Sequence, residues 1–340
     1  MKKLLIAILI VAGLASCDTN NENNDQLFKI NMNLENSSNK TVYLGRYDHE
    51  EMIILDSVVA KHNKATFKVN KSDNLDALLI MMNGWRRPLT FFADNQDVTI
   101  TGDYQNYNGI SVVASESQNK INELTEAVNE MEDDNEIRCF VMDFIKQNSD
   151  KPIGVYALYR YKWAFSLEDL QKLYEIIPQD MQSEYKLEVM KYIDGLEMTS
   201  VGESFIGFKQ NDVNGYPVSF ADIIKISKVV ILDFWASWCP DCRKANPGLV
   251  ALYDEFNDKG LKIVSVSLDT NEEAWKQAIE KDDLKWRHHL SDLKGWDNSV
   301  AKSYTISYIP QTIVFDENGI IIGKNLPEEE LRELLKTVLE

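Results

Sequence analysis

Apolar and polar residues alternate through the first third of the chain. Between Leu27 and about Val113, short runs with an apolar residue at every second position are interrupted by Asn, Asp, Ser and Gly. Such alternation is typical of strands with one buried face. We therefore predict an antiparallel β-sandwich or meander over residues 27–115, with no assignable chemistry. Its basic and aromatic run Trp85–Arg87 is interpreted as an ordinary loop, with an interaction site as the alternative.

Along residues 116–197 the apolar period changes to 3.6, which is typical of amphipathic helices. One stripe contains Ile121, Leu124, Val128 and Met131, and a second contains Ile137, Phe140, Val141, Phe144 and Ile145. We therefore predict a helical middle segment of four or five helices. Cys139 lies about 200° around the helical wheel from Ile137, away from the second stripe. We expect this cysteine to be inert, with an exposed reactive thiol as the alternative.

The last third of the chain combines strand-like and helix-like patterns. Val229–Phe234 is a nearly continuous apolar run, as expected for a strand buried on both faces. The predicted elements that follow are a helix ending near Lys259, a strand over 261–268, a helix beginning near Glu272, strands over 312–315 and 320–322, and an amphipathic helix from Leu331 to Leu339. This order predicts an α/β domain over residues 198–340, in which a sheet lies between helices.

The chain begins with the features of an export signal. Lys2 and Lys3 precede the apolar stretch Leu4–Ala15. This stretch is shorter than the roughly 20 residues that an apolar helix needs to cross a bilayer. Residues 1–16 are therefore predicted to be a signal peptide that is removed from the mature protein.

The end of this signal resembles the lipobox of bacterial lipoproteins, in which cleavage precedes a cysteine whose thiol is then acylated. The matching residues are Leu14–Cys17, and residues 18–26 contain no apolar side chain. We predict a lipoprotein signal peptide over 1–16, lipidation of Cys17 and a solvated tether over 17–26. The expected location is the cell envelope, with the protein anchored to a bacterial membrane and facing the periplasm. The alternative is an ordinary cleavage site with an unmodified Cys17.

Composition narrows the classes of partner. The 340 residues include 36 Lys and Arg against 54 Asp and Glu, a net charge of −18. So acidic a surface repels phosphate groups, which argues against nucleic acid and anionic lipid headgroups as partners. A hydrophobic content of 44% is unlike that of disordered proteins. Four cysteines are too few for a disulfide-stapled scaffold.

The candidate chemistry lies where the buried strand meets the next helix. Cys239 and Cys242 follow Val229–Phe234 and precede a helical pattern. Residues three apart share a helical face, so the two sulfurs can reach bonding distance. Backbone N–H groups and the helix dipole favour a thiolate at Cys239, which we expect to be the nucleophile. Cys242, one turn inside the helix, is expected to resolve the mixed disulfide.

Zinc binding is the alternative use of such a cysteine pair. A structural zinc site needs four ligands, and the other cysteines are the predicted lipid anchor Cys17 and the distant Cys139. His288 and His289 are neighbours on an expected extended segment, so their side chains point to opposite faces. We therefore predict no metal, and no cofactor apart from the redox-active disulfide.

Two separated segments carry a family resemblance. Asp233–Arg243, together with Tyr308–Thr312, resembles the thioredoxins and, more closely, the membrane-tethered TlpA/ResA-like thiol-disulfide oxidoreductases. Residues 267–269 and 291–296 are also similar to that family, and several of its lipoproteins carry a preceding β-domain and helical region. The resemblance implies a thioredoxin-like fold for residues 198–340 and thiol-disulfide exchange as the activity. It also implies a place in cytochrome c biogenesis, where such proteins often act.

The same resemblance assigns roles to residues outside the cysteine pair. Pro310 matches the cis-proline that faces the active-site disulfide, which leaves the backbone of Ile309 to pair with an extended substrate segment. Asp233 matches the buried carboxylate beneath the cysteines, where it would take the proton from Cys242. The alternative for Asp233 is a strand-end acid exposed to water. Trp238 matches a rim aromatic and is expected to contact substrate.

One position departs from the family pattern. Thioredoxin-like motifs usually place Pro before the second Cys, whereas here Pro240 follows the first and Asp241 takes the other position. The charge of Asp241 is expected to raise the pKa of the Cys239 thiol and to make the dithiol a better reductant. We therefore expect a reductase or isomerase of envelope protein disulfides, supplied by a membrane electron donor. Pro240, with Trp238, is expected to contribute to substrate binding.

Two other classes of function stay open at this point. A binding or scaffold lipoprotein would use the first two regions and keep the thiol pair secondary. A thiol peroxidase would share the fold. Peroxidases of this kind carry Thr three residues before the reactive Cys to hydrogen-bond the peroxide, whereas this chain has Ala236 there.

Overall fold

The computed structural model describes residues 26–48, 51–72 and 76–340. The predicted signal peptide, Cys17 and nearly all of the tether therefore lie outside the described residues. The chain forms two compact units, Met1–Lys120 and Ile121–Glu340.

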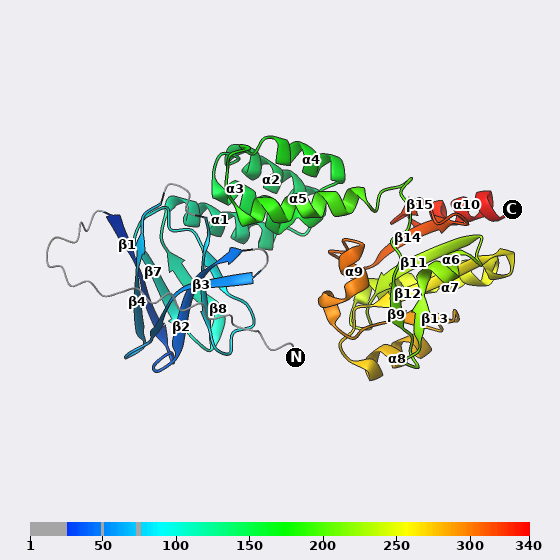
Figure 1. Cartoon of the computed structure of the whole chain (residues 1–340), viewed down its shortest axis with the longest axis horizontal. Helices are drawn as coiled ribbons and strands as arrows, with labels where there is room; N and C mark the ends of the chain where they lie inside the picture. Colours follow the sequence, from blue (N-terminus) through cyan, green and yellow to red (C-terminus); the bar gives the residue numbers. More distant parts are fainter. Residues whose placement is uncertain (1–25, 49–50, 73–75) are drawn as a thin grey trace. The chain divides into compact units, whose positions relative to one another are not determined.

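The N-terminal unit is rich in β-structure, as predicted (Figure 1). Its described residues form two four-stranded sheets. The strands of the first are β1 (Leu27–Glu35), β4 (Lys64–Asn70), β7 (Val98–Asp103) and β8 (Asn106–Val113), in the order β4-β1-β7-β8. The strands of the second are β2 (Thr41–Asp48), β3 (Glu51–Val59), β5 (Leu78–Met82) and β6 (Leu89–Phe91), in the order β3-β2-β5-β6.

The alternating apolar residues of both sheets form one core. In β1, Ile30, Met32 and Leu34 are buried while the residues between them are exposed or partly exposed. Ile100 of the first sheet and Ile80 of the second belong to the same cluster. Burying an apolar side chain of this size contributes about 1.5–3 kcal/mol each, so the sequence pattern selects which face of each strand turns inward.

One strand pair departs from the predicted antiparallel arrangement. β1 and β7 pair in parallel, with Ile30 opposite Val98 and Leu34 opposite Gly102. The other paired strands of the two sheets run antiparallel. The first sheet is therefore mixed, and the expectation of a purely antiparallel domain is wrong. Period-two alternation reports which face of a strand is buried but is the same for both strand directions.

Helices follow the β-rich part. They are α1 (Glu116–Glu130), α2 (Asp134–Gln147), α3 (Pro152–Tyr161), the short 3-10 helix η2 (Lys162–Ala164), α4 (Leu167–Glu175) and α5 (Glu184–Glu197). Ser166 caps the start of α4, because its side chain accepts the backbone N–H of Asp169. Asp133 caps α2 in the same way through the backbone N–H of Glu136. No helix in the described part of the chain is long and apolar enough to cross a bilayer.

The second predicted stripe of the middle segment lies on α2. Ile137, Val141 and Ile145 are buried, whereas Phe140 is 40% exposed. Cys139 is an exposed free thiol, consistent with its place off the stripe. Only part of this stripe therefore packs inward.

The C-terminal domain contains a five-stranded mixed sheet with helices around it (Figure 1). Its strands are β11 (Val229–Trp235), β12 (Leu261–Ser267), β13 (His288–Leu290), β14 (Gln311–Asp316) and β15 (Ile321–Lys324), in the order β13-β12-β11-β14-β15. β11 lies in the centre, parallel to β12 and antiparallel to β14. Every residue of β11 is buried, as its continuous apolar run predicts.

Several short elements of this domain are absent from the predicted order. The helices are α6 (Phe220–Ile224), α7 (Pro240–Phe256), η3 (Asn257–Lys259), α8 (Glu272–Lys281), η4 (Gly295–Asp297), α9 (Ser299–Ser303) and α10 (Glu328–Leu339), and a hairpin is formed by β9 (Lys209–Asn211) and β10 (Pro217–Ser219). The missed elements β9, β10, β13, α6 and α9 have three to five residues each. Such lengths are too short for an apolar period to be recognised.

Candidate active site

The cysteine pair lies at the start of α7, directly after the central strand β11. Cys239 is the N-cap of this helix, and its Sγ accepts the backbone N–H of Cys242 at 3.1 Å. The two residues form a disulfide, with their Cα atoms 5.3 Å apart. Cys239 is 5% exposed and Cys242 1% exposed. After reduction, the same N–H group and the helix N-terminus favour a thiolate on Cys239, the more accessible sulfur.

The loop before β14 faces the disulfide. The Ile309–Pro310 peptide bond is cis, and the Ile309 carbonyl oxygen lies 3.8 Å from the Cys239 Sγ. Within the described residues, no hydrogen bond uses the backbone N–H of Ile309. An extended segment of another chain can therefore pair with this backbone beside the sulfur.

Asp233 is buried in β11 beneath the cysteine pair. Its side chain is 2% exposed and accepts a hydrogen bond of 2.8 Å from the Ser265 hydroxyl. Burial raises the pKa of Asp233 to about 7, although the hydrogen bond from Ser265 acts in the opposite direction. The Trp286 indole N–H in turn donates to Ser265 at 3.0 Å and fixes that hydroxyl. The alternative of a water-exposed acid at a strand end is therefore wrong.

A cavity of about 250 Å³ joins these groups. Its lining includes Asp233, Cys242 and Pro310, together with apolar side chains of α7 such as Leu249. The volume and the polar lining are sufficient for water molecules, which need about 10–15 Å³ each and two to four polar partners. The cavity therefore borders both Asp233 and Cys242.

A second buried carboxylate, Asp269, holds the loop that carries the cysteines. Asp269 is 1% exposed and accepts hydrogen bonds from the Ser237 backbone N–H at 2.9 Å and the Ser237 hydroxyl at 2.5 Å. The Ser267 hydroxyl adds a third at 2.7 Å. The sequence did not single out Ser237, and Asp269, considered as an acid that assists proton transfer by resemblance to ResA-like proteins, was left out of the predicted catalytic residues. The signal that could have found this contact is the register of β11 and β12. Ser267 pairs with Trp235, so the residues that follow the two strands lie at the same edge of the sheet.

Two exposed tryptophans stand beside the disulfide-bearing loop. Trp238 is 52% exposed and Trp296 47% exposed, with ring centroids 6.4 Å apart. Trp238 also donates its indole N–H to the Leu268 carbonyl at 3.3 Å. Pro240 is exposed at the first position of α7. The predicted substrate-contacting residues Trp238 and Pro240 are thus accessible, and Trp296 is a neighbour that sequence reasoning did not single out.

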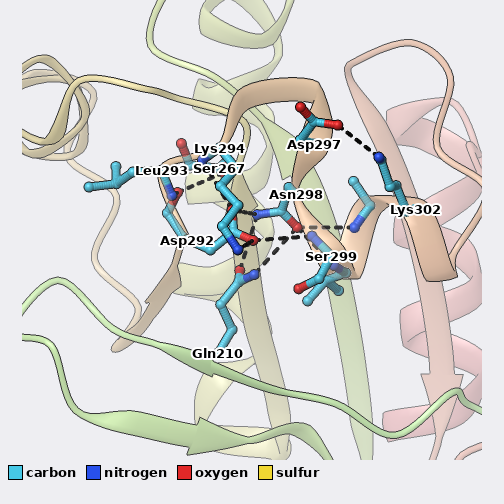
Figure 2. A network of polar contacts seen from close by, with 12 residues as sticks. Gln210, Ser267, Asp292, Leu293, Lys294, Asp297, Asn298, Ser299 and Lys302 are labelled. Carbon is cyan, nitrogen blue, oxygen red and sulfur yellow. Dashed lines mark hydrogen bonds and ion pairs between the residues drawn. The ribbon is translucent and has the colours of Figure 1, made fainter. Parts of the chain in front are cut away.

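A polar network orders the loop that carries Trp296 (Figure 2). Asn298 is fully buried at its centre, donates to Asp292 at 3.0 Å and accepts two backbone N–H groups at the start of α9. Gln210 contacts Asn298 from β9 at 3.4 Å. The Ser291 hydroxyl donates to the Ser267 carbonyl at 2.9 Å, which ties this loop to the end of β12.

The charges around the cysteines are distributed unevenly. Arg243 is held by Asp282 and by the Ser237 carbonyl, and Asn246 also donates to Asp282 at 2.6 Å. Burial opposes the ionisation of Asp282, but hydrogen bonds from Arg243 and Asn246 outweigh it and lower the pKa. Asp241 is exposed and has no cationic partner among the described residues. Asp241 thus places a negative charge in the first turn of α7, next to the cysteine pair in sequence, and Arg243 is already paired with Asp282.

None of the other candidates among the described residues lines the cavity beside the cysteine pair. Cys139 is on α2, and Cys17 lies outside the described residues. His289 is buried, and desolvation lowers its pKa to about 4, so its imidazole is neutral. His288, the neighbouring residue of β13, is only partly buried. The described residues contain no group of three or more His, Cys, Asp or Glu side chains placed to hold a metal ion.

Two known families match successive parts of the chain. Residues 201–324 match the AhpC/TSA family, and residues 28–121 match a domain of unknown function, DUF4369. The disulfide, Asp233 and Pro310 all lie within the first match. The β-rich domain corresponds to the second.

Characterised relatives resemble the C-terminal part. ResA, a thiol-disulfide oxidoreductase of Bacillus cereus, is 28% identical over 150 residues, which cover 43% of this chain and 83% of ResA. ResA of Bacillus subtilis is 27% identical over 128 residues, covering 38% and 68%.

Solved structures match the same part. The thioredoxin domain of a Bacteroides vulgatus thiol-disulfide oxidoreductase is 34% identical and has a TM-score of 0.38, covering 42% of this chain and 99% of that one. A thiol-disulfide oxidoreductase of Bacteroides fragilis is 32% identical with a TM-score of 0.38, covering 40% and 100%. On the family match and the ResA relatives, the C-terminal part of this chain is a thioredoxin-like domain similar to the AhpC/TSA family, and the protein is a thiol-disulfide oxidoreductase that resembles ResA.

Proposed function

We propose that the protein reduces or isomerises disulfides of proteins in the bacterial envelope. The observation that carries this proposal is the cysteine pair at the N-terminus of α7, with the Ile309 carbonyl 3.8 Å from Cys239 and a cavity that connects Cys242 to Asp233. A nucleophile, a resolving thiol, a proton acceptor and a substrate-docking backbone are thus gathered at one place.

The reaction begins with the reduced pair. The Cys239 thiolate attacks one sulfur of the substrate disulfide, forms a mixed disulfide and releases the other substrate sulfur as a thiolate, which takes up a proton. The Cys242 thiol then loses its proton to Asp233, whose pKa near 7 suits a general base at neutral pH. The Cys242 thiolate attacks the Cys239 Sγ, forms the intramolecular disulfide and releases the second substrate thiol. The substrate has gained the two electrons that the dithiol lost.

The direction of exchange follows from the charges beside the nucleophile. The exposed carboxylate of Asp241 disfavours a thiolate on Cys239, while Arg243, which follows Cys242 in sequence, is neutralised by Asp282. A less stabilised thiolate shifts the equilibrium between dithiol and disulfide towards the disulfide. The dithiol is therefore a good reductant, and the disulfide is a weak oxidant. A membrane electron donor must then restore the dithiol by delivering two electrons and two protons per cycle. The chain needs no cofactor beyond the disulfide.

The substrate is docked by the rim of the site. The backbone of Ile309 offers hydrogen bonds to an extended segment, and Pro310 holds this backbone against the sulfur. Trp238 and Pro240 supply exposed apolar contacts on the other side of the disulfide. The expected substrates are envelope proteins with an accessible disulfide. A place in cytochrome c biogenesis is part of this proposal and rests on the family resemblance.

A trapping experiment tests the assignment of the two cysteines. The Cys242→Ser variant is expected to accumulate a mixed disulfide between Cys239 and substrate, because the resolving thiol is absent. Cys239→Ser is expected to form none, and Cys139→Ser, which removes the exposed thiol of α2, is the matched control with full exchange activity. Mass spectrometry of non-reduced adducts identifies the bonded sulfur. Trapping through Cys139, or equal trapping by both active-site variants, would contradict the assignment.

Membrane attachment is a separate part of the proposal. Lipidation of Cys17 is supported by the sequence Leu14–Cys17 and the polar residues that follow it. Replacing Cys17 with Ser should release the protein from the membrane fraction, since one or more acyl chains would be lost. Tight attachment of that variant would contradict lipidation while leaving the redox assignment intact.

Neither alternative function is favoured by an observation in the structure. Position 236, where a thiol peroxidase would carry a hydroxyl for the peroxide, holds a fully buried Ala. Saturable peroxide consumption by the purified protein would revive the peroxidase reading. A scaffold role predicts that the cellular phenotype survives in a Cys239→Ser, Cys242→Ser variant.

A further inference from the structure

A second pocket lies in the β-rich domain, within a single unit of the structure and apart from the redox chemistry. It has a volume of about 570 Å³, within the roughly 300–1,000 Å³ range of small-molecule sites. Its lining comes from two loops, the β5–β6 loop and the β7–β8 turn with the start of β8. The lining residues are Gly84, Trp85, Arg86, Arg87, Tyr104, Gln105, Tyr107 and Asn108.

Hydrogen bonds hold the aromatic wall of this pocket in place. The Trp85 indole N–H donates to the Tyr104 carbonyl at 3.1 Å, and the Tyr104 hydroxyl donates back to the Asn83 carbonyl at 2.5 Å. The Tyr107 hydroxyl donates to the Pro88 carbonyl at 2.9 Å. The two loops are thus cross-linked three times by aromatic side chains. A wall that is already ordered costs little further entropy when a ligand binds.

The backbone at Gly84 fits this arrangement. Gly84 has φ +97°, and a Cβ atom there would stand 2.7 Å from the Tyr104 hydroxyl. A residue without a side chain is therefore required for Tyr104 to reach the loop. The ring of Tyr107 meets that of Trp85 edge to face at 5.2 Å, which completes the aromatic surface.

Two guanidinium groups stand at this aromatic surface. Arg87 lies 5.1 Å from the centre of the Tyr107 ring, as in a cation–π contact. Arg86 and Arg87 are exposed, and neither forms an ion pair with a carboxylate in the parts of the chain that the structure describes. No Asp or Glu is among the described residues that line the pocket. This concentration of positive charge stands out in a chain whose net charge is −18.

We propose that this pocket binds a small organic anion that carries a ring. Its acidic group would be held by the forked N–H groups of Arg86 and Arg87, which match carboxylate and phosphate oxygens in pairs. Its ring would lie against Trp85 and Tyr107. The amides of Gln105 and Asn108 at the same rim supply hydrogen bonds for further polar substituents. The β-rich domain is thereby a ligand-binding domain attached to a redox enzyme.

The test is a titration of the full chain with small-molecule probes. Binding is monitored through the NMR signal of the Trp85 indole N–H. Trp85 is one of seven tryptophans, and its signal is identified by its loss in Trp85→Phe. The probes are glucuronate as a sugar acid, indole-3-acetate as an aromatic acid and glucose 1-phosphate as a ring phosphate. Acetate, inorganic phosphate and neutral glucose are the comparison compounds. These arms distinguish the kind of ring and the kind of acid.

At least one ring acid is expected to bind saturably and at least tenfold more tightly than acetate, phosphate or glucose. Arg86→Ala with Arg87→Ala should weaken that binding at least tenfold. The control is Lys61→Ala with Lys64→Ala, which removes the same charge from exposed positions outside the pocket. This variant should change the affinity for the ring acid less than twofold. Removal of two arginines can also disturb the loops, so a second variant, Arg86→Lys with Arg87→Lys, keeps the positive charge but lacks the paired guanidinium N–H groups. This variant is expected to bind the ring acid more weakly than the native chain.

Three results would overturn the proposal. One is the absence of saturable binding by all three ring acids. Another is equal affinity for inorganic phosphate or acetate, which would show a general attraction of anions without recognition of a ring. The last is undiminished binding in the variant that lacks both arginines. The dispersion of the NMR signals of the β-rich domain checks that each variant is folded, because the redox site lies in the other unit and does not report on this domain.

Discussion

The redox site and the pocket of the β-rich domain are built in opposite ways. Cys239 and Cys242 stand in one short segment, and their chemistry requires those residue types at that spacing. The pocket draws Trp85 from one loop and Tyr107 from another, and none of its lining residues is a nucleophile or a reactive thiol. A reactive group is therefore visible in the sequence, whereas a binding surface emerges only when loops are brought together.

The two sites also differ in how burial is used. Around the disulfide, burial shifts a proton equilibrium, because Asp233 has, among the described residues, a single serine hydroxyl as its side-chain partner and no ion pair. In the pocket, the charged groups stay exposed, and burial serves to fix the Trp85 ring. The comparison predicts that changes in one site leave the other intact, and disulfide exchange in a Gly84→Ala variant tests that separation.

The largest expected effect concerns Asp233 and the pH dependence of stability. The folded-state pKa is about 7, above the value of about 3.9 in an unfolded chain, so the folded protein binds this proton more tightly. Stability from this group is complete below pH 4 and is lost as pH rises through 7. Asp233→Asn removes the ionisation, and the native chain should lose on the order of 4 kcal/mol relative to this variant between pH 4 and pH 8.

Urea denaturation of the oxidised protein at several pH values measures this difference. Asp241→Asn is the matched control, because the carboxylate it removes is exposed, and its curve should run parallel to that of the native chain. A native curve parallel to that of Asp233→Asn would contradict the assignment of the buried proton.

The next largest effect concerns Gly84 in the pocket loop. Gly84→Ala places a Cβ atom at φ +97° and 2.7 Å from the Tyr104 hydroxyl, which should destabilise the β-rich domain by about 1–3 kcal/mol. Gly202→Ala is the control, since Gly202 has φ +99° but no atom within 4 Å of the added Cβ, and it reports backbone strain alone. Thermal unfolding gives the stability. Loss of disulfide exchange in folded Gly84→Ala would show that the two sites are coupled.

A smaller effect is expected at Trp296. Its exposed ring lies 6.4 Å from Trp238, so Trp296→Ala should lower kcat/KM for a protein disulfide roughly fivefold, or about 1 kcal/mol. The rate with a small aromatic disulfide should change less, because such a compound does not reach beyond the sulfur. Trp163→Ala removes a similarly exposed ring, 39% against 47%, from the helical segment and should have no effect. Equal losses with both substrates would point to a disturbed active-site loop instead.

The smallest effect tests the partner of Asp233. Ser265→Ala removes the hydrogen bond that lowers the pKa of Asp233, so this pKa should rise further, by less than one unit. Carboxyl carbon NMR chemical shifts follow the titration directly. Ser291→Ala is the control, because Ser291 is also buried but bonds to the Ser267 carbonyl. A downward shift in Ser265→Ala would mean that the hydroxyl does not stabilise the carboxylate.

Much of the fold was predictable because burial leaves a period in the sequence. The run Val229–Phe234 predicted the central buried strand, and the alternation from Phe28 to Leu34 predicted the inward face of β1. The direction of β7 beside β1 was not predictable, since alternation is the same in both directions. Short pieces such as β13 contain too few residues to show any period.

The candidate site was predictable to the extent that its chemistry is tied to residue type. Cys239 and Cys242 were recognised by their spacing of three residues at a strand-to-helix junction. Pro310 was recognised by the resemblance of Tyr308–Thr312 to the family motif. The Ser237–Asp269 contact depends on strand register, which places loops from two strands at one edge of the sheet. Trp296 reaches Trp238 because the buried Asn298 orders its loop, and a lone Asn in a polar stretch gives no sign of that role.

The central claim is that Cys239 and Cys242 form a reducing pair, and the reduction potential of this pair tests it most directly. Equilibration of the full chain against defined thiol buffers gives the value. The charge of Asp241 and the neutralisation of Arg243 predict a potential near that of thioredoxin, around −270 mV. Asp241→Asn should move it towards more oxidising values. A native potential near −120 mV, typical of a strong disulfide donor, would contradict the account.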